Sequence, residues 1–234
     1  MVRHLSPPAI LLCVLAASAG AQTNGTALLA GKVVSQSGRA LRATVVLQPL
    51  FRASVRSVPT TLTGAYQFSQ ISPGKYRICA QAPADQTSPS EPFLDACDWA
   101  MAEGPFELYP GQSMTEFQVT VPGGALLQIQ VNDPQQIFAA LPSGQIPPGL
   151  DTQLQLILRS SNRQAHRVRL LSQITGGRIY SAIVPVGVPL GLTVTSANGS
   201  ISDSSGNPVT AEIPLNVPQG ATPAALNFTI HHQL

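Results

Sequence analysis

Residues 116–131, EFQVTVPGGALLQIQV, contain the pattern that decides the fold. Apolar and polar residues alternate over 116–121 and again over 127–131, with Pro122-Gly123-Gly124 between the two runs. Alternation with a period of two is typical of an antiparallel strand with one buried face. The stretch therefore predicts two consecutive strands, and we interpret the Pro-Gly-Gly break as the junction between two domains.

The same alternation recurs along the chain, and signals for helices are nearly absent. Further strands are predicted at 28–34, 43–49, 64–71, 74–80, 153–159, 165–172, 177–184, 190–196, 210–217 and 226–231. Short strands bounded by turn residues at this spacing favour β-sandwiches. We predict an all-β chain with two tandem antiparallel β-sandwiches of the Ig-like type, over residues 27–122 and 123–234.

Charge is sparse in this chain. Of its 234 residues, 13 are Lys or Arg and 11 are Asp or Glu, which is 10% charged with a formal net charge of +2. Average domains carry roughly a quarter of charged residues, so this composition excludes a coiled coil, a salt-bridged helical bundle and a charged disordered tail. The small net charge also excludes a nucleic-acid binder that works by bulk charge.

The first 21 residues have the organisation of an export signal. Arg3 and His4 precede an apolar run over 9–17, and Ala19-Gly20-Ala21 follows it. This order predicts a signal peptide at 1–21 that is cleaved after Ala21. The apolar run is shorter than the ~20 residues that span a bilayer. We expect a secreted or periplasmic protein without a membrane span after cleavage.

Two cysteines, Cys79 and Cys97, follow the predicted signal. In an oxidising compartment such a pair predicts a disulfide. The alternatives are two buried free thiols or half of a metal site, but no His or Cys lies close enough in sequence to complete a zinc cluster. We predict the disulfide, and we predict neither a metal ion nor a cofactor.

The two halves share a short repeated pattern of glycines, which we call the echo. Gly64 and Gly74 bound a predicted strand and turn in the first half, and Gly177 and Gly187 do so in the second with the same ten-residue step. A divergent repeat of one sandwich explains the echo, and coincidence in a glycine-rich chain is the alternative.

A family resemblance covers roughly residues 28–122. Its motifs are GKVV at 31–34, SGRAL at 37–41, ATVVL at 43–47, TGAYQF at 63–68 and ISPGKY at 71–76. They resemble the carboxypeptidase regulatory-like domains, small transthyretin-like sandwiches that are also grouped with carbohydrate-binding-like folds. Residues 76–79 and 97–99 are similar to exported bacterial members of this group.

The resemblance implies an accessory domain and not a catalyst. Peptidases of that family bind zinc in a separate domain through a His-x-x-Glu pair, and neither His166 nor His231 begins such a motif here. The chain also lacks a Gly-x-Ser-x-Gly elbow. We expect an exported, non-enzymatic binding or structural module, whose partner is an extracellular or cell-wall glycan or another exported protein. A hydrolase of unknown substrate is the third class.

An acidic and aromatic segment, 91–109, is the first candidate site. It is predicted as a loop, and it holds five of the 11 carboxylates together with Phe93, Trp99, Phe106 and Tyr109. Aromatic faces beside carboxylates are suited to a sugar. The candidate ligand-binding residues are Phe93, Asp95, Asp98, Trp99 and Tyr109. Packing of a disulfide-tethered loop and calcium binding are the alternatives.

An arginine-rich hairpin is the second candidate site. Its basic residues are Arg159, Arg163, His166, Arg167, Arg169 and Arg178. We select Arg159, Arg167 and Arg169 as candidates for docking an acidic partner, such as the 91–107 loop of a second copy, or an anionic glycan. The alternative is the solvated face of an edge strand.

Overall fold

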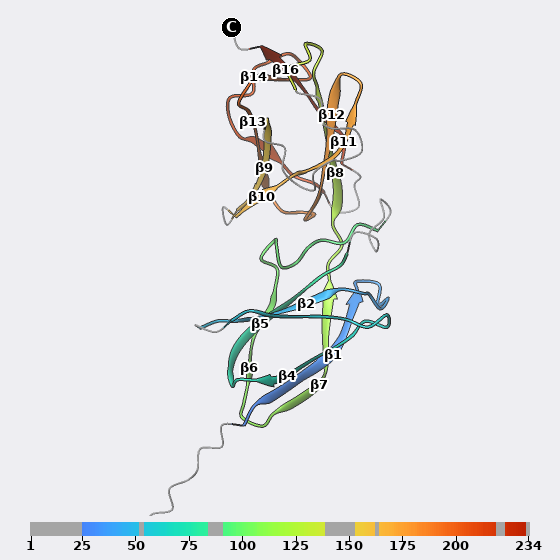
Figure 1. Ribbon diagram of the computed structural model, residues 1–234, viewed down its shortest axis with the longest axis vertical. Coiled ribbons are helices and arrows are strands. Elements are labelled where there is room, and N and C mark those ends of the chain that lie inside the picture. Colours follow the sequence, from blue (N-terminus) through green and yellow to red (C-terminus); the bar gives the residue numbers. More distant parts are fainter. Residues whose placement is uncertain are drawn as a thin grey trace, which may run out of the picture.

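The computed structural model describes residues 25–51, 54–83, 91–138, 153–161, 164–218 and 223–232. All regular elements in these ranges are β-strands, and they form four sheets. The sheets make two β-sandwiches that follow each other along the long axis of the molecule (Figure 1). The prediction of an all-β chain with two tandem sandwiches is confirmed.

The predicted signal peptide, 1–21, lies outside the described residues. Within the described ranges, no helix has the length and apolar character needed to cross a bilayer.

The first sandwich packs a three-stranded sheet against a four-stranded one. The three-stranded sheet has the order β4 (Ala65–Ile71), β1 (Ala27–Ser35), β7 (Ser113–Val121), and the other has the order β3 (Arg56–Pro59), β2 (Thr44–Pro49), β5 (Gly74–Gln81), β6 (Glu103–Leu108). Alternate residues of both sheets face inward, among them Leu29, Val45, Phe68 and Ile78, which are all fully buried. The alternation of apolar and polar residues that we predicted therefore places the apolar residues of each strand in the core.

The second sandwich packs a five-stranded sheet against a four-stranded one. The five-stranded sheet has the order β11 (Arg169–Ile174), β12 (Gly177–Val184), β8 (Ala125–Asn132), β16 (Leu226–His232), β14 (Gly199–Asp203). The four-stranded sheet has the order β10 (Ala165–Arg167), β9 (Leu154–Ser160), β13 (Leu190–Ser196), β15 (Ile213–Leu215). Ile129, Leu158, Leu192 and Ile230 are fully buried in its core.

The first and last strands of each sandwich are parallel neighbours, which differs from the purely antiparallel sheets that we predicted. β1 pairs with β7, and β8 pairs with β16, in parallel. In each case the first strand also has an antiparallel neighbour on its other edge, β4 or β12. Local alternation does not reveal such pairs, because it carries no information on which distant strand fills an edge.

Both sandwiches have the same connectivity. The order β4-β1-β7 corresponds to β12-β8-β16, and β3-β2-β5-β6 corresponds to β10-β9-β13-β15, with β11 and β14 added at the edges of the second sandwich. The echo segments 64–74 and 177–187 hold the equivalent strands β4 and β12. This agreement supports a divergent repeat, which stays a prediction.

Three strands were not predicted, and one predicted strand is divided. β3 and β14 are short edge strands with few apolar residues, and β6 contains Pro105. The prediction of a loop over 91–109 is therefore wrong at 103–108. The predicted strand 165–172 breaks at Val168, because the chain passes there from the edge of one sheet to the edge of the other.

We expect the substitution Gly31→Ala to destabilise the first sandwich. Gly31 lies on β1 opposite Phe117 of β7, and a Cβ atom at this position would overlap the carbonyl oxygen of Phe117. Overpacking against backbone is costly, so the free energy of unfolding should fall by at least about 2 kcal/mol in urea denaturation.

Gly123→Ala is the matched control for this substitution. A Cβ atom at position 123 has one near neighbour, the side-chain oxygen of Gln36 at 3.2 Å, and a flexible side chain moves easily. An equal loss of stability in the two variants would contradict the close approach of β1 and β7.

Candidate functional site at the junction of the sandwiches

The linker between the sandwiches is short and is hydrogen-bonded to a loop. β7 ends at Val121 and β8 begins at Ala125. The amide of Leu94 donates to the carbonyl of Pro122 at 2.9 Å, and the amide of Gly124 donates to the carbonyl of Pro92 at 2.8 Å. The linker therefore pairs like a strand with residues 92–94, and it is not a free tether.

The segment 91–102, which we call the junction loop, is fixed to the first sandwich by a disulfide. Cys79 on β5 is bonded to Cys97 in the loop, with a Cα–Cα distance of 5.3 Å. The predicted pairing of the two cysteines is confirmed. Cys79 is buried although it is on the outer face of its sheet, because the junction loop covers it.

Asp95 shapes the turn of the junction loop. Its Oδ1 accepts hydrogen bonds from the amides of Cys97 at 3.0 Å and Asp98 at 2.9 Å. Its Oδ2 accepts a hydrogen bond from Nε2 of Gln81 on β5 at 2.9 Å. Asp95 thus links the loop to the first sandwich and holds the loop backbone in a local turn, which is a common use of Asp.

The same loop inserts apolar side chains into the second sandwich. Leu94 is 1% exposed and Trp99 is 7% exposed, and both belong to the buried cluster of the second sandwich, together with Ile129, Leu156 and Val168. The junction loop is therefore bonded covalently to one sandwich and buried in the core of the other.

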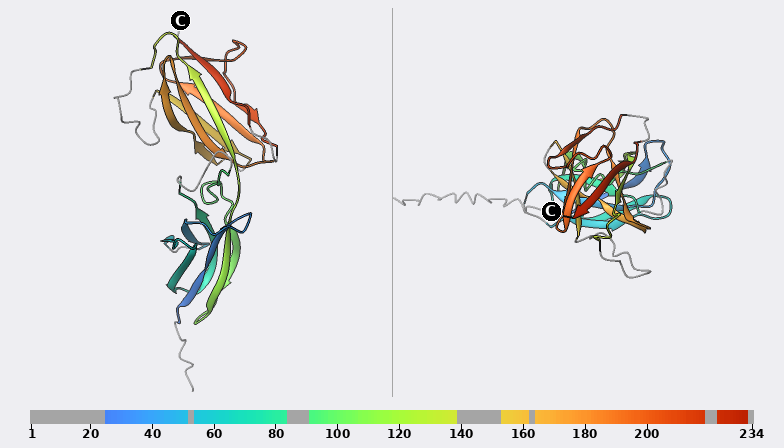
Figure 2. Two further views of the ribbon diagram at one scale, coloured as in Figure 1. Left: turned by 90° about the vertical axis from the view of Figure 1, so that its right-hand side faces the viewer. Right: turned by 90° about the horizontal axis from the view of Figure 1, so that it is seen from above.

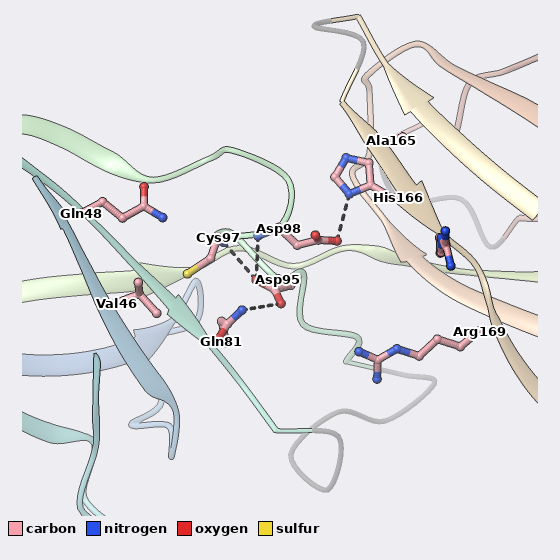
Figure 3. Close-up of a pocket in the computed structure, with 10 residues that line it drawn as sticks. Val46, Gln48, Gln81, Asp95, Cys97, Asp98, Ala165, His166 and Arg169 are labelled. Carbon is pink, nitrogen blue, oxygen red and sulfur yellow. Dashed lines mark hydrogen bonds and ion pairs between the residues drawn. The ribbon is translucent and has the colours of Figure 1, made fainter. Parts of the chain in front are cut away.

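Strand β10 of the second sandwich contacts the junction loop through His166. The imidazole stacks on the Trp99 indole with ring centroids 3.6 Å apart and an interplanar angle of 19°. Nδ1 of His166 lies 2.9 Å from Oδ2 of Asp98 (Figure 3). Nε2 of Gln164 donates to the carbonyl of Asp98 at 2.5 Å. An ionised carboxylate only accepts, so Nδ1 is the donor in the His166–Asp98 bond.

These contacts bring the two predicted sites together. The acidic segment and the arginine-rich hairpin meet across the junction within one chain, through Asp98, Trp99 and His166. We predicted the hairpin as a docking site for an acidic partner such as the 91–107 loop of a second copy, whereas the contact described here lies within one chain. The apolar Leu94 and Trp99 in an otherwise acidic segment were the available signal for a buried contact.

The aromatic residues of the segment form no platform for a sugar. His166 covers one face of the buried Trp99 indole, and Phe93 is buried in the core of the first sandwich with the Arg39 guanidinium 5.4 Å from its ring centroid. Tyr109 is 58% exposed, but it precedes β7, whose nine residues separate it from the junction by roughly 30 Å. Of the roles that the sequence left open for Trp99, its burial agrees with packing of the loop and not with stacking on a sugar.

The candidate arginines also divide into separate groups. Arg159 donates to Oγ1 of Thr193 at 3.0 Å and lies 3.7 Å from the carboxylate of Glu212, so it is held on the surface of its own sheet. Arg178 is buried with its guanidinium 4.4 Å from the ring centroid of Phe138. Arg163 lies outside the described residues. Arg167 and Arg169 are exposed beside the junction.

A cavity of about 750 Å³, which we call the junction cavity, lies between the sandwiches (Figure 3). Its first side comes from β2, β5 and the junction loop, and its second side comes from β10 and β11. The lining residues are Val46, Gln48, Gln81, Asp95, Cys97 and Asp98 on the first side, and Ala165, His166, Arg167 and Arg169 on the second.

One serine–histidine pair lies elsewhere. Oγ of Ser202 on β14 is 2.8 Å from Nε2 of His231 on β16. Ser202 is buried, and no carboxylate in the described ranges bonds to His231. The pair is a cross-strand bond without the third group of a catalytic triad. In the same ranges, no group of three His, Cys, Asp or Glu residues is arranged to hold a metal ion.

Comparisons with known proteins give only distant likenesses. No protein-family model matches the sequence, and no curated protein matches it. The resemblance to the carboxypeptidase regulatory-like domains thus stays a prediction.

Several solved structures overlap with parts of this fold. The Bacillus anthracis TIE protein is 10% identical, with a TM-score of 0.34 over 88% of this chain and 34% of that one. A streptococcal ancillary pilin is 12% identical, with a TM-score of 0.36 over 86% and 62%. The minor pilin GBS52 of Streptococcus agalactiae is 11% identical, with a TM-score of 0.36 over 89% and 98%. The chain thus spans about a third of the first protein and under two thirds of the second.

We expect Trp99→Ala to destabilise the second sandwich although the residue precedes it in the chain. Removing a buried Trp side chain leaves a cavity, so the free energy of unfolding should fall by about 3–5 kcal/mol. Trp99 is the single Trp of the chain, so far-ultraviolet circular dichroism should follow the unfolding instead of fluorescence.

Met101→Ala is the matched control, since Met101 is on the same loop and 46% exposed. Its effect should stay within about 0.5 kcal/mol. A Trp99→Ala variant as stable as this control would show that the indole is not part of the second core.

Proposed function

We propose that this chain is an exported, non-catalytic protein whose two β-sandwiches are clamped end to end and act as a stiff structural or binding module outside the cytoplasm. One observation carries this proposal. The junction loop is bonded to the first sandwich through Cys97 and buries Leu94 and Trp99 in the core of the second.

Domains that are joined by a linker move relative to one another unless their interface is large and apolar. Here the linker is hydrogen-bonded to residues 92–94, and an indole from one side is buried on the other. These contacts oppose bending at the junction. The two sandwiches lie in line along the long axis in both side views (Figures 1 and 2). A stiff rod of this kind holds its two ends at a fixed separation, which suits a spacer or a presenting module.

The bonding of the junction loop supports a non-catalytic role. Asp95 is engaged by Gln81 and by two loop amides, and Asp98 is engaged by His166. A glycosidase needs two carboxylates that face a substrate across a cleft. These two carboxylates hold the architecture together instead.

Small-angle X-ray scattering with tryptophan fluorescence tests the clamp. The wild-type curve should fit one elongated conformation, and the Trp99 emission should be that of a buried indole. In the double variant Cys79→Ser/Cys97→Ser the loop loses its covalent anchor, so the emission should shift to longer wavelength and the curve should require a range of interdomain angles.

The variant Met101→Ser is the control for a polar substitution in the same loop, and it should behave like the wild type. A wild-type curve that fits only a mixture of interdomain angles would contradict the clamp.

Export is tested by the mature N-terminus. When the full sequence is expressed in a bacterium, the exported protein should begin at Gln22. Iodoacetamide should alkylate Cys79 and Cys97 only after reduction, because the two sulfurs are bonded to each other. Mass spectrometry measures both properties. The control lacks residues 1–21 and should stay in the cytoplasm, and recovery of an exported protein that still begins at Met1 would contradict the predicted cleavage.

A further inference from the structure

The junction cavity contains charged groups that the architecture does not use. It is bounded by both sandwiches, and its volume of about 750 Å³ is within the range of small-molecule sites. Its acidic side is engaged internally, because Asp98 bonds to His166, and Asp95 bonds to Gln81 and to loop amides. Three of the four carboxylate oxygens on this side therefore already accept hydrogen bonds from the protein, and Oδ1 of Asp98 is the fourth.

The basic side of the cavity is different. Arg167 and Arg169 flank Val168, which is buried and whose amide donates to the carbonyl of Leu156 at 3.0 Å. Residues two apart on an extended chain point to the same face, so both guanidinium groups lie on the face opposite to the core. Neither forms an ion pair or a side-chain hydrogen bond with any part of the chain that the structure describes. Figure 3 shows the Arg169 side chain extending from β11 towards the first sandwich.

Besides Asp95 and Asp98, the opposite side of the cavity offers the uncharged amide of Gln48. Gln48 projects from the outer face of β2, and its described hydrogen bond is a weak one from Nε2 to Sγ of Cys79 at 3.9 Å. Arg77 lies directly opposite Gln48 in the β2–β5 register and is exposed. The Gln48 amide therefore lines the cavity across from Arg167 and Arg169, and Arg77 is its neighbour on β5.

The unpaired charged groups of the described lining, Arg167 and Arg169, favour a negatively charged ligand over a neutral ring. The Trp99 indole is buried against His166, and none of the described residues that line the cavity is Phe, Tyr or Trp, so this lining offers a sugar no ring on which to stack. Guanidinium groups bind carboxylates through two parallel hydrogen bonds, and such charge-assisted bonds are stronger than neutral ones.

We propose that the junction cavity binds a small carboxylate-bearing molecule, with the carboxylate on Arg167 and Arg169 and the polar remainder on Gln48. A sugar acid and an aliphatic polycarboxylate share this chemistry. The inference goes beyond the structural role and rests on it in one respect, since the cavity exists only while the two sandwiches stay clamped.

Isothermal titration of the full mature chain with glucuronate, citrate and glucose tests the proposal. Glucuronate, citrate or both should bind, and glucose should not. Binding of glucuronate alone assigns a sugar acid, and binding of citrate alone assigns an aliphatic polycarboxylate. The double variant Arg167→Gln/Arg169→Gln should weaken binding about tenfold or more, because it removes charge-assisted hydrogen bonds to the ligand.

The matched control is Arg159→Gln. It removes a positive charge from the neighbouring strand β9, where Arg159 is held by Thr193 and Glu212 and does not line the cavity, so binding should be unchanged. The absence of binding of either acid at 10 mM, about equal affinity of the double variant and the wild type, or equal binding of glucose would each overturn the proposal. Scattering separates this failure from a failure of the clamp, since the double variant and the wild type should give the same curve.

Discussion

The burial of Trp99 is the contact on which the arrangement of this protein depends. The indole is carried by a loop of the first sandwich but lies in the hydrophobic core of the second, so the second sandwich does not complete its packing at the junction alone. The Cys79–Cys97 disulfide restricts the loop, which reduces the entropy that is lost when the indole is buried. A buried side chain and a covalent bond together turn a short linker into a fixed junction.

The sparse charge of the chain has a specific arrangement around this contact. Asp95 and Asp98 are engaged in the turn of the junction loop and in the bond to His166. Arg159 is engaged by Glu212 on its own sheet. Arg167 and Arg169 lie beside the junction without such partners in the described ranges. Of the charges that line the cavity, Asp95 and Asp98 hold the architecture, and Arg167 and Arg169 are the ones available for recognition.

Much of the site could be located from the sequence, but its role could not. The concentration of carboxylates and aromatic rings in 91–109 and the arginines near 167 were correctly identified as the unusual features of an otherwise uncharged chain. Their contact within one chain was not predicted, because the bond between Asp98 and His166 joins residues 68 positions apart. A Trp beside two Asp residues has the composition of a sugar site and also that of a packed loop, and only its burial distinguishes the two.

The sequence by itself determined most of the strands, the two sandwiches and the disulfide pair. Alternation, turn residues and a pair of cysteines are local signals, and backbone geometry converts them directly into structure. The tertiary structure alone decided the parallel pairing of β1 with β7 and of β8 with β16, the break at Val168 and the destination of Trp99. These features depend on which distant surfaces meet, and the pattern of apolar residues shows that a side chain is buried without showing against what.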